Sequence, residues 1–327
     1  MRIQALENKV EKATQTIHLT SPRIVCYHQT HFYNGQRISF LPLLEKKTAV
    51  SHIILAAIHL NEPGNITLND DPYDIALNDV IWEEVRTVQK AGIKVLGMLG
   101  GAALGSFQRL EKDFDLYYKL LRGMVVQTGL DGLDLDVEEE ISLASIIRLI
   151  DQLRYDFGKD FLITLAPVAT ALQEGKHLSG FDYPTLEAVF GHNIAWYNTQ
   201  FYCGWGSVED TTGYDKIIEL GWAADKVVLG VTTNPESALG WVPDEMLQAT
   251  LLSLTGKYPN FGGVMGWEYF NSITAAEPFG WPWSWANLMT SILLPDFASS
   301  PAAEKRSSLV QNPLCSEMTR AIAGSDA

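Results

Sequence analysis

The segment Asp131-Gly132-Leu133-Asp134-Leu135-Asp136-Val137-Glu138 places acidic and apolar side chains at alternate positions. Side chains of a β-strand alternate between its two faces, so the acidic residues share one face and the leucines and the valine share the other. The apolar face suits packing under helices. We therefore expect a buried strand that carries Asp134, Asp136 and Glu138 into the interior of a barrel.

Seven more short apolar runs accompany this segment. Amphipathic stretches with a helical period separate them, such as the one from Ile146 to Phe157, which stops at Gly158. Continuous apolar runs are typical of parallel strands that are covered on both faces, so the chain is predicted to repeat a strand and a helix. The eight runs are residues 23–27, 52–58, 93–99, 132–137, 161–166, 194–202, 226–231 and 263–269.

Eight such units fit a closed (β/α)8 barrel, which typically has about 250 residues. No glycine-rich dinucleotide fingerprint follows the first run, which disfavours an open doubly wound sheet. We predict an α/β fold, a single TIM barrel over residues 22–295. Residues 1–21 are expected to be a polar lead-in. Residues 296–327 are expected to be a disordered tail, because Ser, Ala, Pro and scattered charges replace the periodic pattern there.

The formal net charge of the chain is −15. Binding to nucleic acid or to an anionic membrane needs clustered Lys and Arg, so we expect neither partner, whereas a neutral ligand such as a sugar is compatible. Cys26, Cys203 and Cys315 fit neither a disulfide framework nor a zinc site. The histidines form no His-Glu-x-x-His pair. We expect no metal and no cofactor.

The start of the chain has scattered charges and lacks the apolar centre of a secretory signal, and no window reaches the length of a membrane span. This start predicts a cytoplasmic protein. A trimmed chain, or one exported by a non-classical route, would look the same. We expect the protein to be a monomer.

The acidic run also predicts chemistry. Three carboxyl groups stacked in a partly desolvated interior cannot all be ionised comfortably, so their pKa values are coupled and some protons are retained. Such coupling keeps a Glu protonated near neutral pH, as a general acid requires. Glu138 stands at the carboxyl end of its strand, where barrel enzymes carry their chemistry, and is the predicted proton donor. A solvated acidic edge and a cation site remain as alternatives.

Residues 131–138 match the DGxDxDxE signature of glycoside hydrolase family 18, and the chain resembles that family over residues 22–294. Further shared elements are Gly100-Gly101, Ala166-Pro167, Gln200-Phe201-Tyr202 and Gly263-Val264-Met265-Gly266-Trp267. The resemblance implies a retaining mechanism in which the acetamide of the substrate attacks the anomeric carbon, in place of an enzyme carboxylate. Glu138 would protonate the leaving oxygen and later activate water.

The resemblance also implies roles around this acid. Asp136 would orient the acetamide N–H, with Asp134 beneath it sharing a proton. Tyr202 would hold the acetamide oxygen, Gln200 would bind the same sugar, and Trp267 would form an apolar floor under it. The predicted substrate-binding set is completed by Tyr27, Asn198 and Gly101. From residue types alone, Gln200 could instead be a buried amide that pairs with backbone groups, and Trp267 and Tyr27 could instead be packed in the core.

Three departures bear on the kind of family member. The sixth run carries Gln200-Phe201-Tyr202 in place of the Met-x-Tyr-Asp of processive chitinases, and Met98 stands where many relatives have Ser. Only residues 232–262 separate the last two runs, and much of that stretch, residues 243–258, has the pattern of the barrel's own helix, so the α+β insertion domain of those chitinases is not expected. The groove should be shallow and open, which suits a branched glycan as well as a linear polymer.

Longer segments resemble the fungal endo-β-N-acetylglucosaminidases of the family: YHQTH at 27–31, LNDDP at 68–72, WYNTQFY at 196–202 and GVMGWEYFN at 263–271. This resemblance implies hydrolysis of the β-1,4 bond in the N,N'-diacetylchitobiose core of N-glycans, of the high-mannose type, on glycoproteins or free oligosaccharides. A chitinase acting on chitin oligomers and a glycan-binding protein without turnover are the alternatives. Glu138 disfavours the second of these.

Overall fold

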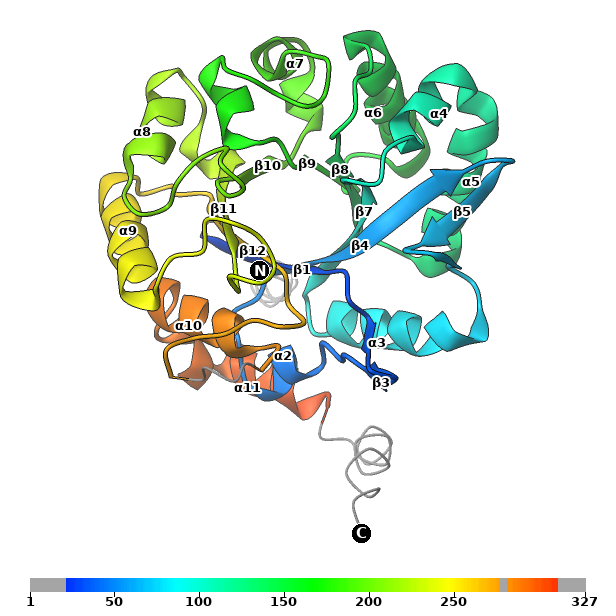
Figure 1. The fold of residues 1–327 in the computed structure, drawn as a ribbon. Coiled ribbons are helices and arrows are strands. Elements are labelled where there is room, and N and C mark those ends of the chain that lie inside the picture. The colour runs from blue at the N-terminus through cyan, green and yellow to red at the C-terminus, as the bar shows by residue number, and fades with distance from the viewer. Residues whose placement is uncertain (1–21, 277–280, 311–327) are drawn as a thin grey trace, which may run out of the picture.

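Eight parallel strands close on themselves in the computed structural model of the chain, which describes residues 22–276 and 281–310 (Figure 1). The strand β1 pairs in parallel with both β4 and β12, which closes the barrel. Around the barrel the strands are β1 (Arg23–His28), β4 (His52–Asn61), β7 (Lys94–Gly100), β8 (Gly132–Asp136), β9 (Leu162–Leu165), β10 (Trp196–Gln200), β11 (Val227–Thr232) and β12 (Gly263–Trp267). The predicted fold and its eight strands are confirmed.

Helices ring the outside of the barrel (Figure 1). The α-helices are α2 (Pro42–Glu45), α3 (Asp79–Lys90), α4 (Ser106–Lys112), α5 (Phe114–Thr128), α6 (Leu143–Phe157), α7 (Tyr183–Phe190), α8 (Thr212–Glu219), α9 (Asp244–Lys257), α10 (Ser284–Leu293) and α11 (Pro301–Ser308). Single 3-10 turns are η1 (Ala76–Asn78), η2 (Ala169–Gln173), η3 (Gly191–Asn193), η4 (Ala224–Lys226) and η5 (Phe297–Ser299). The stretch between the last two strands contains the helix α9 and two loop segments, so no separate module is inserted there, as predicted.

The apolar side chains form two layers. The larger layer lies between the strands and the helices and contains Leu133, Leu135 and Val137 from the acidic run. A smaller layer fills the barrel interior and includes Val25, Ile54 and other inward residues of the strands. The acidic face of β8 therefore looks into the barrel and its apolar face packs under helices, as its alternating sequence predicts.

The strand β4 runs beyond the predicted end at residue 58 and turns back into a hairpin. It pairs antiparallel with β5 (Asn65–Leu68), which pairs in turn with the short β6 (Asp71–Pro72). The turn contains Pro63-Gly64, a dipeptide that favours tight turns. A second small hairpin follows β1 and consists of β2 (Phe32–Tyr33) and β3 (Gln36–Arg37). Both hairpins stand near the carboxyl ends of their strands.

The predicted disordered tail is wrong for residues 297–310. The helix α11 lies against α2 (Figure 1), and its first turn is capped by the Ser300 side chain, which accepts a hydrogen bond from the Ala303 N–H. Arg306 is buried and donates from Nε to the Ala91 carbonyl at 3.2 Å and from its guanidinium to the Val50 carbonyl at 3.0 Å. The predicted lead-in, residues 1–21, and residues 311–327 lie outside the described residues.

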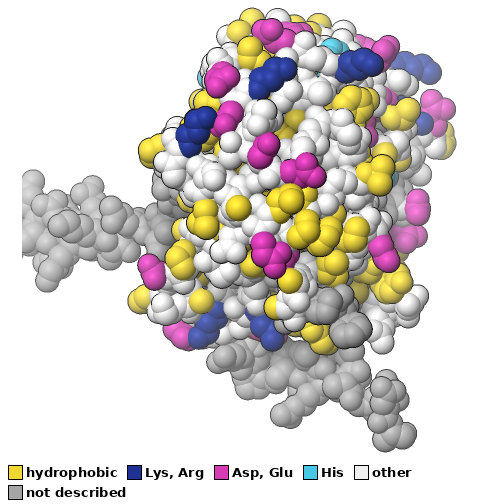
Figure 2. Space-filling view, turned by 60° about the vertical axis from the view of Figure 1, so that its left-hand side comes forward, with side chains coloured by type: hydrophobic (Ala, Val, Ile, Leu, Met, Phe, Trp, Pro, Cys, Tyr) yellow, Lys and Arg dark blue, Asp and Glu magenta, His cyan; other side chains and the backbone are white. Residues whose placement is uncertain are grey.

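The surface shows no concentration of basic side chains on the face drawn in Figure 2, where Lys and Arg are spread among Asp and Glu. In the described part of the chain, none of the helices has the length and apolar character that crossing a bilayer requires.

We predict that Arg306→Met lowers the free energy of unfolding by about 2–3 kcal/mol, because it removes charged hydrogen bonds and leaves buried carbonyl groups without a donor. Arg122→Met is the matched control: Arg122 forms an ion pair with Asp156, its side chain is 50% exposed, and its loss should cost less than about 1 kcal/mol. Denaturant unfolding of both variants checks this. Equal small losses would contradict the docking of α11.

Candidate active site

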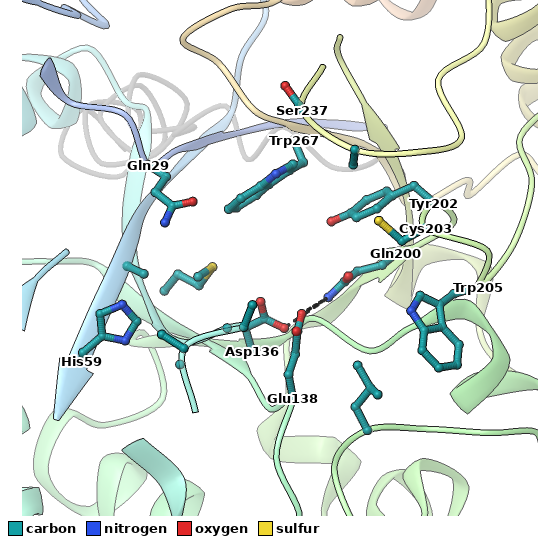
Figure 3. Close-up of a pocket in the computed structure, with 18 residues that line it drawn as sticks. Gln29, His59, Asp136, Glu138, Gln200, Tyr202, Cys203, Trp205, Ser237 and Trp267 are labelled. Atoms are coloured by element: carbon teal, nitrogen blue, oxygen red, sulfur yellow. Dashed lines mark hydrogen bonds between the residues drawn. The ribbon is translucent and has the colours of Figure 1, made fainter. Parts of the chain in front are cut away.

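A cavity of about 270 Å³ opens where the strands end, and two of the predicted acidic residues, Asp136 and Glu138, line it (Figure 3). Asp136 and Glu138 come from the end of β8, Gln200 from the end of β10, and Trp267 from the end of β12. The carboxyl ends of parallel strands meet at one rim of a barrel, so residues far apart in sequence converge here.

Asp134 lies beneath the cavity and is fully buried. Its Oδ2 accepts a hydrogen bond from the Tyr27 hydroxyl at 2.6 Å, and its Oδ1 accepts from Thr164 Oγ1 at 2.5 Å and from Asn198 Nδ2 at 3.0 Å. Burial raises the pKa of Asp134, and the three hydrogen bonds lower it in part. The donors stabilise negative charge on Asp134. Its sharing of a proton with Asp136 stays a prediction.

Asp136 and Glu138 form a coupled pair above it. Burial raises the pKa of Asp136 well above its usual value, and the charges of Glu138 and Asp134 raise it further. Burial also raises the pKa of Glu138, while a hydrogen bond from Gln200 opposes that rise. Gln200 Nε2 lies 3.2 Å from Asp136 Oδ1, 3.4 Å from Glu138 Oε1 and 2.9 Å from the Ala166 carbonyl. The pair therefore retains a proton at a pH where an isolated carboxyl group is ionised.

Trp267 and Tyr202 lie across the cavity from these carboxyl groups (Figure 3). The indole of Trp267 is partly exposed and faces the open space. Burial and the charges of Asp136 and Glu138 raise the pKa of Tyr202 well above its usual value, so its hydroxyl keeps its proton and remains a donor. A ligand in the cavity meets a flat apolar surface, a hydroxyl donor and two carboxyl groups.

Gly101 forms a close wall beside Asp136. Its N–H donates to the Asp136 carbonyl at 2.9 Å, and its φ of +87° lies in the region that favours glycine. A Cβ at this position would lie 2.9 Å from Met98 Cε and 3.5 Å from Asp136 Oδ2. Glycine thus keeps space open next to the carboxylate, and Gly101 lines the cavity, while its binding of substrate stays a prediction.

Tyr27 and Asn198, predicted to bind substrate, do not line the cavity. Both are buried one layer deeper and hold Asp134. Asn198 precedes Gln200 by two residues on β10, so its side chain points the same way from farther down the barrel. Trp196 Nε1 donates to Asn198 Oδ1 at 2.9 Å, which fixes the amide orientation. Both residues position the carboxyl stack.

Several lining residues come from loops and carry no pattern that singles them out in the sequence. Four further lining residues belong to strands, namely Ala57 and His59 of β4 and Met98 and Gly100 of β7. The loops contribute Gln29, Ala102, Ala103, Leu178, Cys203, Trp205, Ser237 and Ala238. Most of them follow a strand by one to five residues or lie on connections between strand and helix. The exposed thiol of Cys203 stands at the cavity edge, whereas Cys26 is buried.

Two buried carboxylates brace the loops around the cavity. Glu268 accepts hydrogen bonds from the Gln29 N–H at 2.8 Å and from the N–H and hydroxyl of Thr30 at 3.0 and 2.8 Å. Glu139 accepts from the N–H groups of Gly105 and Phe107, both at 2.8 Å. The segments after β1 and β7 are therefore held in place before any ligand arrives.

Neither alternative for the acidic run fits this geometry. Within residues 22–276 and 281–310, no three His, Cys, Asp or Glu side chains are grouped so that they could hold a metal ion. Asp134 and Asp136 are buried, which disagrees with a solvated edge.

Comparison with known proteins agrees with the motif. Residues 23–240 match the model described as glycosyl hydrolases family 18. A fungal endo-β-N-acetylglucosaminidase of that family is 48% identical, with a TM-score of 0.79 over 84% of this chain and 99% of that chain. The chitinase ChiC from Aspergillus fumigatus is 52% identical, with a TM-score of 0.77 over 83% of this chain and 99% of that chain.

A curated relative, Chitinase 2 from Rhizopus oligosporus, is 27% identical over a match of 202 residues that covers 58% of this chain and 36% of that protein. The chain thus spans about a third of the length of this relative.

We predict that Gln200→Leu raises the pKa of Glu138, because it removes the hydrogen bond that lowers this pKa. A 13C NMR titration of the side-chain carboxyl groups measures the change, with Glu138→Gln used to assign the signal. Gln173→Leu serves as the control, since the Gln173 amide donates to the Gly213 carbonyl. An unchanged or lowered pKa in Gln200→Leu would contradict the role given to this amide.

Proposed function

Since the chain belongs to family 18 of the glycosyl hydrolases, we propose that it is an endo-β-N-acetylglucosaminidase. It hydrolyses the β-1,4 bond in the N,N'-diacetylchitobiose core of high-mannose N-glycans and retains the anomeric configuration. The observation that carries this proposal is the pair Asp136 and Glu138, with raised pKa values, facing Tyr202 and Trp267 across an open cavity. An N-acetylated sugar supplies the amide that this arrangement can orient.

In the first step, Glu138 donates its proton to the glycosidic oxygen while the bond from that oxygen to the anomeric carbon breaks. The carbonyl oxygen of the 2-acetamido group forms the new bond to the anomeric carbon, which gives an oxazolinium ion. Asp136 accepts a hydrogen bond from the acetamide N–H and stabilises the positive charge that develops there. Tyr202 donates to the acetamide oxygen and holds it below the anomeric carbon.

In the second step, the Glu138 carboxylate takes a proton from water as the water oxygen attacks the anomeric carbon. The bond to the acetamide oxygen breaks and its electrons return to the acetamide carbonyl. Two inversions at one carbon give overall retention. The raised pKa of Glu138 serves both steps, because the group must hold a proton before the reaction and regain one from water afterwards.

The direction of the substrate follows from the position of the acid. Glu138 lies between Asp136 and Trp205, and Gln29 and His59 lie on the opposite side of Asp136 (Figure 3). The leaving N-acetylglucosamine therefore occupies the side of Trp205, since Glu138 must reach the oxygen that departs with it. The rest of the glycan extends toward Gln29 and His59.

Two observations support an N-glycan as the substrate. The chain is similar to a fungal endo-β-N-acetylglucosaminidase over most of both proteins, and the connection from β11 to β12 carries no inserted domain, so that only the loop residues Ser237 and Ala238 of this connection line the cavity. The second candidate is a chitinase, which the similarity to the chitinase ChiC favours.

Mass spectrometry of the products from a high-mannose glycoprotein, with chitohexaose as competitor, tests the choice. We expect one N-acetylglucosamine to stay on each glycosylated asparagine, and the released glycan to begin with the other. Cleavage of chitohexaose with an untouched glycoprotein would establish the chitinase instead.

Two variants test whether Glu138 is the proton donor. Glu138→Gln should lose about 10²–10⁴-fold in rate, because the proton donor is gone. Glu140→Gln replaces an exposed carboxyl group two residues away and should act like the parent. Cleavage that persists in Glu138→Gln would contradict the assignment of the acid.

A further inference from the structure

Two further hollows meet the active-site cavity at one point. All three spaces are lined by His59 and Ala103, so both hollows adjoin the cavity at these residues, and we call them its two branches. His59 is partly exposed on β4, just before the hairpin turns back into β5. Figure 3 places His59 on the side of Asp136 that is away from Glu138.

The first branch has a volume of about 350 Å³ and lies between the hairpin of β4 and β5 and the helix α4. Its lining includes Asn61, Asn65 and Thr67 from the hairpin and Arg109 from α4. Arg109 donates to the Leu60 carbonyl at 3.1 Å, so its guanidinium is fixed against the hairpin.

The second branch has a volume of about 640 Å³ and lies between the end of the hairpin and the segment that follows β1. Gln29 and Thr30 line one side, and Asp70 and Asp71 line the other. Asn69 joins the two sides, because its Nδ2 donates to the Gln29 carbonyl at 2.8 Å and its Oδ1 accepts from the Ala57 N–H at 3.0 Å. The branch is preformed, which limits the entropy lost on binding.

The two branches differ chemically from the cavity that they leave. Trp205, Tyr202 and Trp267 line the cavity, whereas the branches carry mainly amide, hydroxyl, carboxylate and guanidinium groups, and their lining contains no Trp or Tyr. Such groups pair with sugar hydroxyls as donors and acceptors. A ligand that is rich in hydroxyl groups and lacks acetamide groups, such as mannose, suits the branches better than a further N-acetylglucosamine.

We infer that the two branches bind the two arms of a mannose-containing glycan, one arm between the hairpin and α4 and the other between the end of the hairpin and the segment after β1. This inference rests on the proposed function, since it places the retained part of the substrate on the side of Asp136 away from the acid. A linear chain of N-acetylglucosamine would fill one branch and leave the other without a ligand. The two branches together, which we call the fork, thus select a branched substrate.

Initial-rate kinetics on two glycopeptides tests the fork. One carries a branched high-mannose glycan, and the other has the same chitobiose core with a single β-mannose. Asn65→Ala changes one branch and Asp71→Ala the other, and both side chains are exposed. Each variant should lower kcat/KM on the branched glycopeptide about fivefold, the scale of one lost hydrogen bond. On the branched glycopeptide, the double variant should lose the product of the two factors in kcat/KM. On the short glycopeptide, each variant should have nearly the same kcat/KM as the parent.

Asp74→Ala is the matched control, because Asp74 is exposed but lines neither branch. Equal kcat/KM on both glycopeptides in the parent, or losses in Asn65→Ala and Asp71→Ala that are the same on both substrates, would overturn the fork while the proposed activity stands. Cleavage of chitohexaose with neither glycopeptide cut would overturn the proposed activity and the fork together.

Discussion

Three carboxyl groups, those of Asp134, Asp136 and Glu138, share one side of β8 and its end, and the rest of the site compensates for their charge. Two of them, Asp134 and Asp136, are buried in the barrel interior. Asp134 is the fully buried member, and β1, β9 and β10 each give it a donor, namely Tyr27, Thr164 and Asn198. A negative charge held there raises the pKa of Asp136 above it. The closure and register of the barrel are therefore electrostatic requirements of the site, because they bring donors from three other strands to one carboxylate.

The barrel and the placement of the acidic residues on one face of β8 could be predicted from the sequence for clear physical reasons. Strands covered on both faces need continuous apolar residues, so the eight strands stand out between helical periods. In β8 the side chains alternate between the two faces, so Asp134 and Asp136 share one face whichever strands pair with β8. The strands and the acidic face of β8 depend on residues that are close together in the sequence, so the local pattern is enough to predict them.

Other features depend on contacts that local sequence does not specify. Tyr27 and Asn198 sit at the right strands but one layer too deep to touch a ligand, and depth depends on strand register. His59 lies in the cavity because β4 continues into a hairpin, which the Pro63-Gly64 turn signals only weakly. The docking of α11 had a local signal in Ser300-Pro301, a cap followed by a helix-starting proline, but its anchor, Arg306, binds carbonyls far away in the chain.

The central claim is that Asp136 serves the acetamide of the substrate and Glu138 alone transfers the proton. Comparing Asp136→Asn with the parent, on an intact high-mannose glycopeptide and on the preformed sugar oxazoline, tests it most directly. The account predicts that the variant loses about 10²–10³-fold on the glycopeptide, where the oxazolinium ion must form, and consumes the oxazoline within about tenfold of the parent rate, since Glu138 still activates water. Equal losses on both substrates, or oxazoline consumed no faster than it decays by itself, would contradict the account.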